Sequence, residues 1–291
     1  MAPMTPSSPD KLRALLAGDQ IITMPCCFDP LSAKLIAQEG FGLTFMSGFA
    51  ASAARLGLPD TGLMSYGEVV DQGRNICDAV DIPVIGDGDT GYGNAMNVRR
   101  TVRGFARAGF AAVMIEDQQA PKRCGHTAGK AVVSRDEACE RIRAAVDARA
   151  DDDILILART DARHDHGLDE AIERARMFRD LGADILFVEA PRNRAEMARI
   201  CDELEGPKMA NLLEGGMTPN LPPPELQDMG FKIAAYPLTL LSAAMKAMTG
   251  ALQDFKAGGV SPDRLMSFKE IRTRIGFDDY FAAEKRYSDD R

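Results

Sequence analysis

Eight short runs of apolar residues recur along the chain, each nearly uninterrupted by polar positions. They occupy residues 21–25, 43–47, 83–87, 112–117, 154–160, 184–190, 208–213 and 231–237. Strands with one face in water alternate apolar and polar residues, whereas short continuous apolar runs are typical of parallel strands that are covered on both faces. The pattern therefore predicts eight buried parallel strands.

Longer amphipathic segments separate these runs and carry helix signals. Asp29 is followed by Pro30, a cap with proline at the first helical position, and Ser65 and Ser134 each precede a glutamate by three residues, as in a capping box. Several of these segments end in a glycine just before the next run, where a left-handed C-terminal cap is expected. These glycines are Gly40, Gly109, Gly182 and Gly230.

Eight strands that alternate with helices predict an α/β fold, a (β/α)8 TIM barrel. A doubly wound open sheet is the alternative. The chain has 291 residues and no Pro/Gly/Ser linker that would divide it, so we expect one barrel domain over residues 1–291. Its last part, residues 240–291, is expected to be a helical segment that packs on the barrel or on a partner subunit.

Composition and charge narrow the function classes. The formal net charge is −8 and no basic block is present, which argues against a nucleic-acid partner. The six cysteines form no CxxC pair, so reduced thiols in a cytoplasmic protein are expected. The most apolar stretch, residues 233–248, is interrupted by Pro237 and Lys246 and falls short of a membrane span.

Polar and ionisable residues follow most of the apolar runs. In a barrel the carboxyl ends of the strands meet at one face, where catalytic residues gather. Strand ends also carry polar residues simply because the chain reaches solvent there. That explanation accounts poorly for an arginine, a glutamate and an asparagine that each directly adjoin an apolar run. The residues at these ends are Ser47–Gly48, Asp87–Asp89, Glu116–Asp117, Arg159–Asp161, Glu189, Asn211 and Glu214.

The segment from Gly86 to Gly91 matches the GxGxxG pattern of dinucleotide sites. Two of its variable positions are Asp87 and Asp89, and two carboxylates would repel a pyrophosphate. The same pair suits a hard divalent cation with oxygen ligands. We therefore expect Mg²⁺ or Mn²⁺ here, with an acidic turn that binds no metal as the alternative.

The run Lys122–Arg123–Cys124–Gly125–His126 surrounds a thiol with two bases and an imidazole. Neighbouring positive charge lowers the pKa of a thiol from its reference value of about 8.5, which makes Cys124 a candidate acid or nucleophile. The histidine pair His164 and His166 could bind zinc, but no third ligand stands beside it, and a solvated loop is the favoured interpretation.

These residues resemble the isocitrate lyase/phosphoenolpyruvate mutase superfamily, whose lyase signature is K-[KR]-C-G-H. Further matching pieces occur in the same order between residues 20 and 240. They are MSGFA at 46–50, LPD at 58–60, GDGDTGYGN at 86–94, IEDQ at 115–118, ARTDAR at 158–163, FVEAP at 187–191 and NLLEGG at 211–216. The resemblance implies a (β/α)8 barrel whose eighth helix is swapped between the subunits of a dimer or tetramer.

The resemblance also implies a role for each matching residue. Asp87 would hold Mg²⁺ directly or through water. The hydrated metal shell would be completed by Asp60, Asp89 and Glu116. The carboxylate of the 2-oxo or 2-hydroxy acid would bind to Ser47, the N–H of Gly48 and Arg159. Cys124 would donate a proton from a mobile loop shared with Lys122, Gly125 and His126, and the distal carboxylate or the loop would contact Glu189 and Asn211.

The cysteine narrows the implied reaction, because the phosphonate mutases of this superfamily typically lack it. The implied activity is cleavage of a 2-hydroxy dicarboxylate, of the 2-alkylmalate or 2,3-dimethylmalate type, to a 2-oxo acid such as pyruvate and a carboxylate. Pro237 follows the eighth run, where the related hydrolases are expected to carry a hydroxyl. Methylisocitrate lyase and oxaloacetate hydrolase or decarboxylase are the alternatives. Carboxyvinyl-carboxyphosphonate phosphorylmutase and a non-catalytic barrel that binds dicarboxylates are less favoured. The expected partner is thus a small di- or tricarboxylate substrate.

Overall fold

The computed structural model describes residues 6–123, 131–150 and 152–288. Eight strands form one sheet in the order β6-β5-β4-β3-β2-β1-β8-β7, and every pairing within it is parallel. A bridge between Leu186 and Lys208 joins the two outermost strands. The sheet is therefore a nearly closed barrel, which confirms the predicted (β/α)8 fold and excludes the open sheet. The strands are β1 Ile22–Cys27, β2 Thr44–Met46, β3 Val84–Asp87, β4 Ala112–Glu116, β5 Leu155–Thr160, β6 Ile185–Val188, β7 Met209–Asn211 and β8 Ile233–Tyr236.

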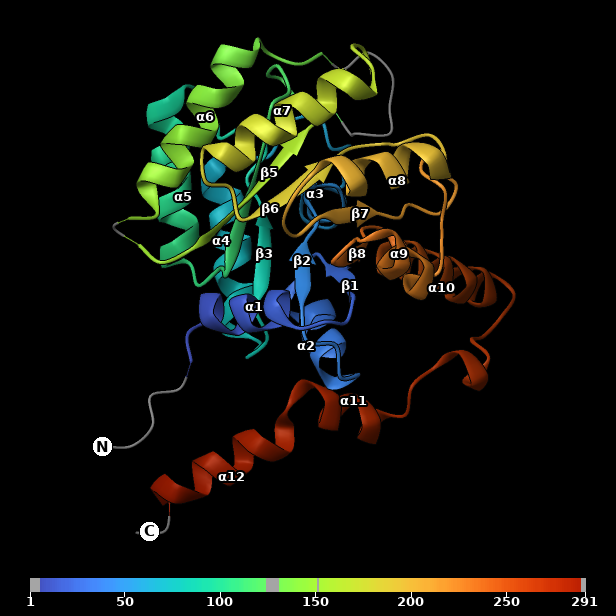
Figure 1. Ribbon diagram of the computed structural model, residues 1–291. Helices are drawn as coiled ribbons and strands as arrows, with labels where there is room; N and C mark the ends of the chain where they lie inside the picture. The colour runs from blue at the N-terminus through green and yellow to red at the C-terminus, as the bar shows by residue number, and fades with distance from the viewer. Residues whose placement is uncertain (1–5, 124–130, 151, 289–291) are drawn as a thin grey trace. The chain divides into compact units, whose positions relative to one another are not determined.

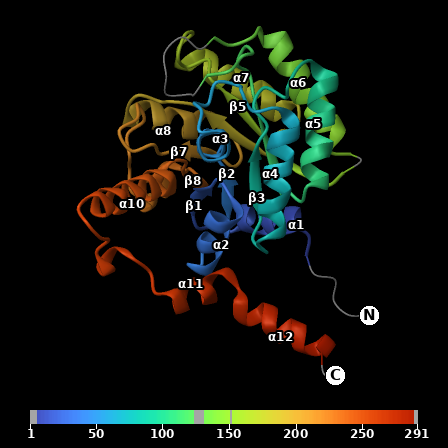
Figure 2. The ribbon, with the colours of Figure 1, turned by 180° about the vertical axis from the view of Figure 1, so that it is seen from behind.

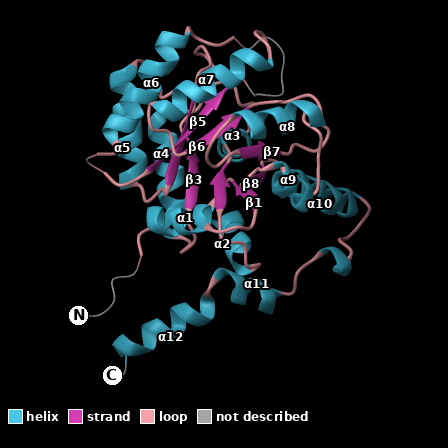
Figure 3. Ribbon diagram, viewed as in Figure 1, coloured by secondary structure: helices cyan, strands magenta, loops and turns pink. Residues whose placement is uncertain are grey.

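The helices of residues 1–240 surround the strands (Figures 1 and 3). Seen from behind, α4 and α5 lie side by side on the outside of the barrel (Figure 2). The helices are α1 Ser8–Ala17, α2 Pro30–Gln38, α3 Gly48–Leu56, α4 Tyr66–Asp78, α5 Ala95–Arg107, α6 Arg135–Ala148, α7 Leu168–Asp180, α8 Arg194–Glu203, α9 Pro223–Met229, α10 Thr239–Lys256, the 3-10 turn η1 Pro262–Arg264, α11 Phe268–Ile275 and α12 Phe277–Ser288.

The strand pleat sends alternate side chains to opposite sides of the barrel wall. In β5, Leu155 and Leu157 belong to the core inside the barrel. Ile156 and Ala158 belong to the core between the strands and the helices. Because successive residues of a strand point to opposite faces, a continuous apolar run fills both cores.

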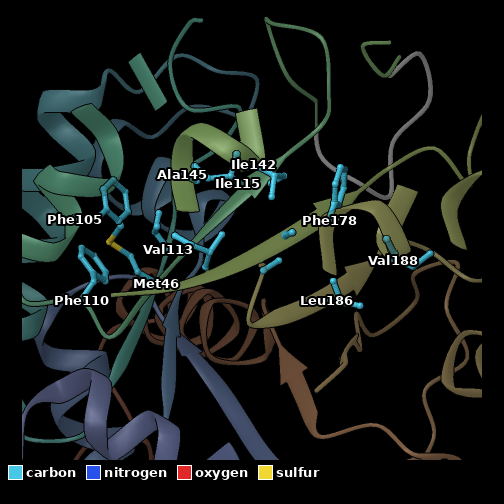
Figure 4. Packing of buried hydrophobic residues seen from close by; sticks show 14 of the residues in the cluster. Met46, Phe105, Phe110, Val113, Ile115, Ile142, Ala145, Phe178, Leu186 and Val188 are labelled. Carbon is cyan, nitrogen blue, oxygen red and sulfur yellow. The ribbon is translucent and has the colours of Figure 1, made fainter. Parts of the chain in front are cut away.

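The outer core is the larger cluster, and its packing is tight around α5 (Figure 4). Phe105 of α5 stacks on Phe110 with ring centroids 4.8 Å apart. Met46 of β2 and Val113 of β4 belong to the same buried cluster. The cluster fixes the helices against the strands and hence the strand ends that carry the polar residues.

Helix α1 closes the amino-terminal end of the barrel. Leu12 is fully buried against the inner core. The Lys11 ammonium donates to the carbonyl of Asp81, which precedes β3, at 2.7 Å. With this end covered, the carboxyl ends of the strands form the open face.

The helix signals in the sequence are largely confirmed. Ser65 forms the full capping box with Glu68, and the four glycines predicted as caps have φ between 84° and 102°. Ser134 caps α6 by accepting from the N–H of Glu137, but the return half of the box is not made. The Glu137 carboxylate instead accepts from Arg141 one turn along, at 2.7 Å.

The chain divides into two units, residues 1–240 and 241–291. The second unit holds most of α10 together with η1, α11 and α12. Within it, Phe277 and Phe281 lie with ring centroids 5.8 Å apart, and the guanidinium of Arg272 lies 5.0 Å from the Phe277 ring. Across the described ranges, no helix is long and apolar enough to cross a membrane.

Candidate active site

The carboxyl ends of the strands surround a pocket of about 630 Å³, its open mouth included. The residues that line it come from all eight strands or the loops that follow them. Those predicted from the sequence are Ser47, Asp60, Asp87, Glu116, Lys122, Arg159, Glu189, Asn211 and Pro237.

A second layer of pocket residues was missed from the sequence. Five of these residues stand in a strand two positions before a predicted one, as Phe45 before Ser47 and Phe187 before Glu189. Since a strand repeats every two residues, both members of such a pair point into the barrel, and this period could have revealed them. The additional lining residues are Cys26, Phe45, Phe49, Met114, Phe187, Met209, Leu213, Ala235 and Leu238; Arg123, which the sequence already marks as a base beside Cys124, lines the pocket too.

Lys122 lies between two of the predicted metal-site carboxylates. Its ammonium is 2.6 Å from Asp60 and 2.8 Å from Asp89, and its side chain is only 6% exposed. Burial lowers the pKa of Lys122, but the surrounding carboxylates, Asp89 first, more than offset this and hold it well above its ordinary value. The sequence analysis placed Lys122 beside the thiol of Cys124; the structure directs its charge to the acidic cluster.

Asp87, at the end of β3, lies against the start of α3. Its carboxylate accepts from the N–H of Gly48 at 3.2 Å and from the N–H of Asp89 at 3.1 Å. A Cβ atom at position 48 would lie 2.4 Å from Asp87 Oδ2, so only glycine permits this approach. The Gly48 N–H that we expected to bind a substrate carboxylate is therefore bonded to Asp87 in this structure.

Arg159 is the positively charged residue on the pocket wall formed by β5. It lies 3.4 Å from Glu116 and 3.3 Å from Glu189, and the amide of Asn211 donates to Glu189 at 3.3 Å. Burial lowers the pKa of Arg159, but the adjacent carboxylates, Asp161 first, outweigh it and raise the pKa further. Arg159 is a permanent positive charge at the pocket wall.

The acidic side of the pocket has the chemistry of a cation site. Burial raises the pKa of Asp89 to about 7, even though Lys122 opposes the shift. Burial also raises the pKa of Glu116 well above its ordinary value, and one oxygen of this buried carboxylate lacks a hydrogen-bond partner. A divalent cation would relieve both costs.

The geometry sets how such a cation could be held. Among the described side chains, no three carboxylates, imidazoles or thiols converge as direct ligands, because Asp60 and Asp89 face Lys122. The residues therefore fit a hydrated ion that Asp87 would hold beside Glu116, and do not fit a closed cage of protein ligands.

Three predicted residues, Cys124, Gly125 and His126, lie outside the described residues. Gly48 and Asp89 line a smaller adjoining pocket, which also touches Asp60 and Asp87.

The other cysteines that the structure describes are free, as expected. Cys26 lines the pocket wall, but burial raises the pKa of its thiol well above the ordinary value, so it packs as a neutral group. His166 is exposed and His164 pairs with Asp165, in agreement with a solvated loop.

The described geometry agrees with the comparison to known families. Residues 12–256 match the family described as phosphoenolpyruvate phosphomutase. The chain belongs to this family. The match spans all eight strands, so the pocket at their carboxyl ends lies wholly within the family's shared part.

Curated relatives in the phosphoenolpyruvate phosphomutase family cover nearly the whole chain. It is 41% identical over 285 residues to 2,3-dimethylmalate lyase of Eubacterium barkeri, covering 97% of this chain and 98% of the relative. It is 41% identical to the chloroplastic carboxyvinyl-carboxyphosphonate phosphorylmutase of Arabidopsis thaliana, covering 96% and 84%. It is 40% identical to 2-methylisocitrate lyase of Aeropyrum pernix, covering 94% and 88%.

Solved structures of the same superfamily superpose closely. An oxaloacetate acetylhydrolase in complex with 3,3-difluorooxalacetate has a TM-score of 0.92 at 36% identity, covering 97% of each chain. A 2,3-dimethylmalate lyase, described as a PEP mutase/isocitrate lyase superfamily member, also has a TM-score of 0.92, at 35% identity, covering 98% and 97%. A phosphonopyruvate hydrolase complex with oxalate and Mg²⁺ has a TM-score of 0.86 at 30% identity, covering 97% and 99%. The chain is accordingly an enzyme, a carbon–carbon lyase of this superfamily.

Proposed function

We propose that this enzyme cleaves a 2-hydroxy dicarboxylate of the 2-alkylmalate or 2,3-dimethylmalate type to a 2-oxo acid and a carboxylate, with Mg²⁺ or Mn²⁺ as cofactor. The observation that carries the proposal is the composition of one pocket. Arg159 provides a fixed cation, Asp87 and Glu116 provide an acidic side, and Phe187 and Leu213 belong to an apolar wall. A substrate that combines carboxylates, a hydroxyl and an alkyl group would match all three surfaces.

In the proposed mechanism, separate residues bind the two ends of the substrate and transfer the protons. Ser47 and Arg159 bind the carboxylate next to the hydroxyl, and Glu189 with Asn211 faces the distal end. A divalent ion held by Asp87 would polarise the 2-hydroxyl and its carboxylate. The hydroxyl proton leaves to a carboxylate of the acidic side, the C2–C3 bond breaks, and its electron pair moves onto C3. Cys124 then returns a proton to C3 as the general acid.

Pro237 supports a lyase over a hydrolase. It lines the pocket at the end of β8, and proline offers no hydroxyl to assist or orient a water. The oxaloacetate acetylhydrolase that superposes on this chain makes oxaloacetate the natural competing substrate.

A substrate panel tests the proposal. The enzyme, supplied with Mg²⁺, is incubated with 2-alkylmalates, 2,3-dimethylmalate, 2-methylisocitrate and oxaloacetate, and released 2-oxo acid and oxalate are measured. We expect a 2-oxo acid in equal amount to the 2-alkylmalate or 2,3-dimethylmalate consumed. Release of oxalate from oxaloacetate without cleavage of any 2-hydroxy dicarboxylate would identify a hydrolase instead.

The metal is tested on the same enzyme. Exhaustive EDTA treatment is expected to abolish turnover, because the acidic side of the pocket then lacks its counter-ion, and Mg²⁺ or Mn²⁺ should restore it. Asp87→Asn should bind Mn²⁺ more weakly than wild type in a direct titration. Full turnover after EDTA would refute the metal assignment.

A further inference from the structure

Asp161 contacts the substrate-binding arginine from behind. Arg159 donates through Nε and Nη2 to the two carboxylate oxygens of Asp161, at 2.8 and 3.0 Å. The Asp161 side chain is 0% exposed and is not among the described residues that line the pocket. The mechanism proposed above uses Arg159 and leaves Asp161 without a role.

This contact orients Arg159 more strongly than its other ion pairs. A two-bond pairing of a guanidinium with a carboxylate fixes both the position and the plane of the guanidinium. The contacts with Glu116 and Glu189 are longer, at 3.4 and 3.3 Å. Asp161 therefore determines which way the guanidinium plane faces.

Asp161 is itself held by the neighbouring strand. Glu116 and Arg159 are paired in the register of β4 and β5, and both point into the barrel. The next residues, Asp117 and Thr160, point outward, where the Thr160 hydroxyl donates to Asp117 at 2.7 Å. The second oxygen of Asp117 accepts from the N–H of Asp161 at 2.9 Å.

Helix α7 anchors this arrangement from outside the barrel. Arg174 donates to Asp117 at 3.1 Å and to the carbonyl of Val133 at 2.9 Å. Its Nε donates to Glu170 at 2.8 Å, and the side chains of Arg174 and Asp117 are 5% and 1% exposed. A continuous series of hydrogen bonds thus runs from α7 through Asp117 and Asp161 to the pocket.

We propose that Asp161 is a positioning residue that presents the Arg159 guanidinium to the substrate carboxylate, and that Asp117 and Arg174 hold Asp161 in place. Buried ion pairs are weak contributors to stability, because desolvation offsets their attraction. A buried, two-bond pair at the edge of a binding pocket is instead suited to pre-aligning a ligand-binding group. A substrate carboxylate would then meet a guanidinium that is already oriented.

The first test measures the chemical reactivity of the Arg159 guanidinium in the absence of substrate. Phenylglyoxal modifies arginines, and peptide mass spectrometry gives the rate at position 159. Asp161→Asn keeps the shape of the side chain but removes its charge and one acceptor, so we expect at least about tenfold faster modification of Arg159.

A second pair in the same loop provides the matched control. Arg163 donates through Nε to Glu196 at 2.8 Å and through Nη2 to the other oxygen, and neither residue is among the described pocket residues. Glu196→Gln should accelerate modification of Arg163 and leave that of Arg159 unchanged. Asp161→Asn should do the reverse.

The second test is kinetic and rests on the proposed function. Asp161→Asn is expected to lower kcat/KM for the 2-hydroxy dicarboxylate about 10²-fold, mainly through KM, since a misplaced binding group costs about this much. Glu196→Gln should retain wild-type kinetics. If wild type cleaves no such substrate, the proposed function fails, while the labelling experiment still decides the role of Asp161.

Thr160→Val provides an independent test in case Asp161→Asn fails to fold. It removes the hydroxyl that holds Asp117 but keeps the shape of the side chain, so Arg159 should be modified about threefold faster. Unchanged modification of Arg159 in whichever of these variants folds would overturn the proposal.

Discussion

At the scale of single residues, the pocket concentrates negative charge that the described cations only partly balance. The single positive charge of Lys122 is shared between Asp60 and Asp89, and buried Glu116 keeps an oxygen without a hydrogen-bond partner. Such an arrangement costs stability and persists where binding or chemistry needs it. We therefore interpret these charges as part of the proposed reaction.

The first prediction concerns Cys124. A thiol pKa of about 8.5 lies far closer to neutrality than that of an alcohol, so a thiol can protonate a carbanion where a hydroxyl can barely do so. Cys124→Ser should therefore lower kcat by about 10²- to 10⁴-fold, the usual cost of losing a general acid. Steady-state release of 2-oxo acid measures the effect. Near-normal kcat would show that Cys124 only packs its loop.

A second prediction concerns Glu170 of α7, which accepts from Arg174 at the outer end of the series of hydrogen bonds that leads to Asp161. Hydrogen bonds from Arg135 first, and then from Arg174, lower the pKa of Glu170 from 4.5 to about 2. Because the folded-state pKa lies below the unfolded one, the ionised form stabilises the fold fully above pH 4.5, and this contribution disappears as the pH falls towards 2. Glu170→Gln should cost about 1 kcal/mol at pH 7, a value kept small by solvent screening.

Urea denaturation of wild type and Glu170→Gln between pH 7 and pH 2 measures this contribution. The two unfolding free energies should converge at the acid end. Glu173→Gln is the control, because its contact with Arg176 is 3.4 Å long and both side chains are nearly half exposed. A difference for Glu170→Gln that is independent of pH would contradict the assignment.

At the scale of elements, the strands and helices are fitted together at glycines. A Cβ atom on Gly73 of α4 would lie 2.2 Å from the ring of Phe110, and one on Gly86 of β3 would lie 2.6 Å from the ring of Phe105. These glycines let α4 and β3 pack directly on the two stacked rings. The end of β3, which carries Asp87, is positioned by this contact.

The third prediction follows from the two glycines of α4. Gly73→Ala should destabilise the protein by about 1–3 kcal/mol, because the added methyl overlaps a buried ring. Gly67→Ala in the same helix meets no atom nearer than 4.0 Å and should stabilise by up to about 1 kcal/mol through helix propensity. Thermal unfolding compares the two. Equal effects of the same sign would argue against the packing described for α4.

At the scale of the whole molecule, the C-terminal unit carries apolar side chains that the single chain leaves in solvent. Phe268 is 76% exposed and Ile271, Ile275 and Phe281 are between 39% and 42% exposed. Several exposed apolar side chains on neighbouring helices are typical of an interaction site. The predicted packing of residues 240–291 on a partner subunit, with an exchanged eighth helix, would cover it.

The fourth prediction is therefore an oligomer. Light scattering at micromolar concentration should give the mass of two or four chains. Phe268→Glu with Ile271→Glu should shift it towards one chain, since charge in an apolar interface is costly. Met96→Glu, at an exposed apolar residue of α5, is the control and should leave the mass unchanged. A wild-type monomer would count against the exchange.

The local order of the chain could be predicted because its signals are short-range. Apolar runs, serine and aspartate caps and the glycines at helix ends each act within a few residues, so all eight strands and the barrel class followed from their pattern. The polar and charged part of the pocket followed as well, since parallel strands must bring their carboxyl ends to one face, whereas its apolar lining did not. Glu116, Arg159, Glu189 and Asn211 are the clearest cases.

Contacts between distant segments could not be predicted in this way. Lys122 pairs with Asp60 across 62 positions of sequence, and Arg174 donates to Asp117 across 57. Each charged side chain had several partners of opposite charge in the sequence. The partner of each side chain depended on the strand register and on whether the strand pleat directs the side chain into or out of the barrel. It also depended on the cost of burying an unpaired charge. These are properties of the packed barrel, and they arise only when the strands lie side by side.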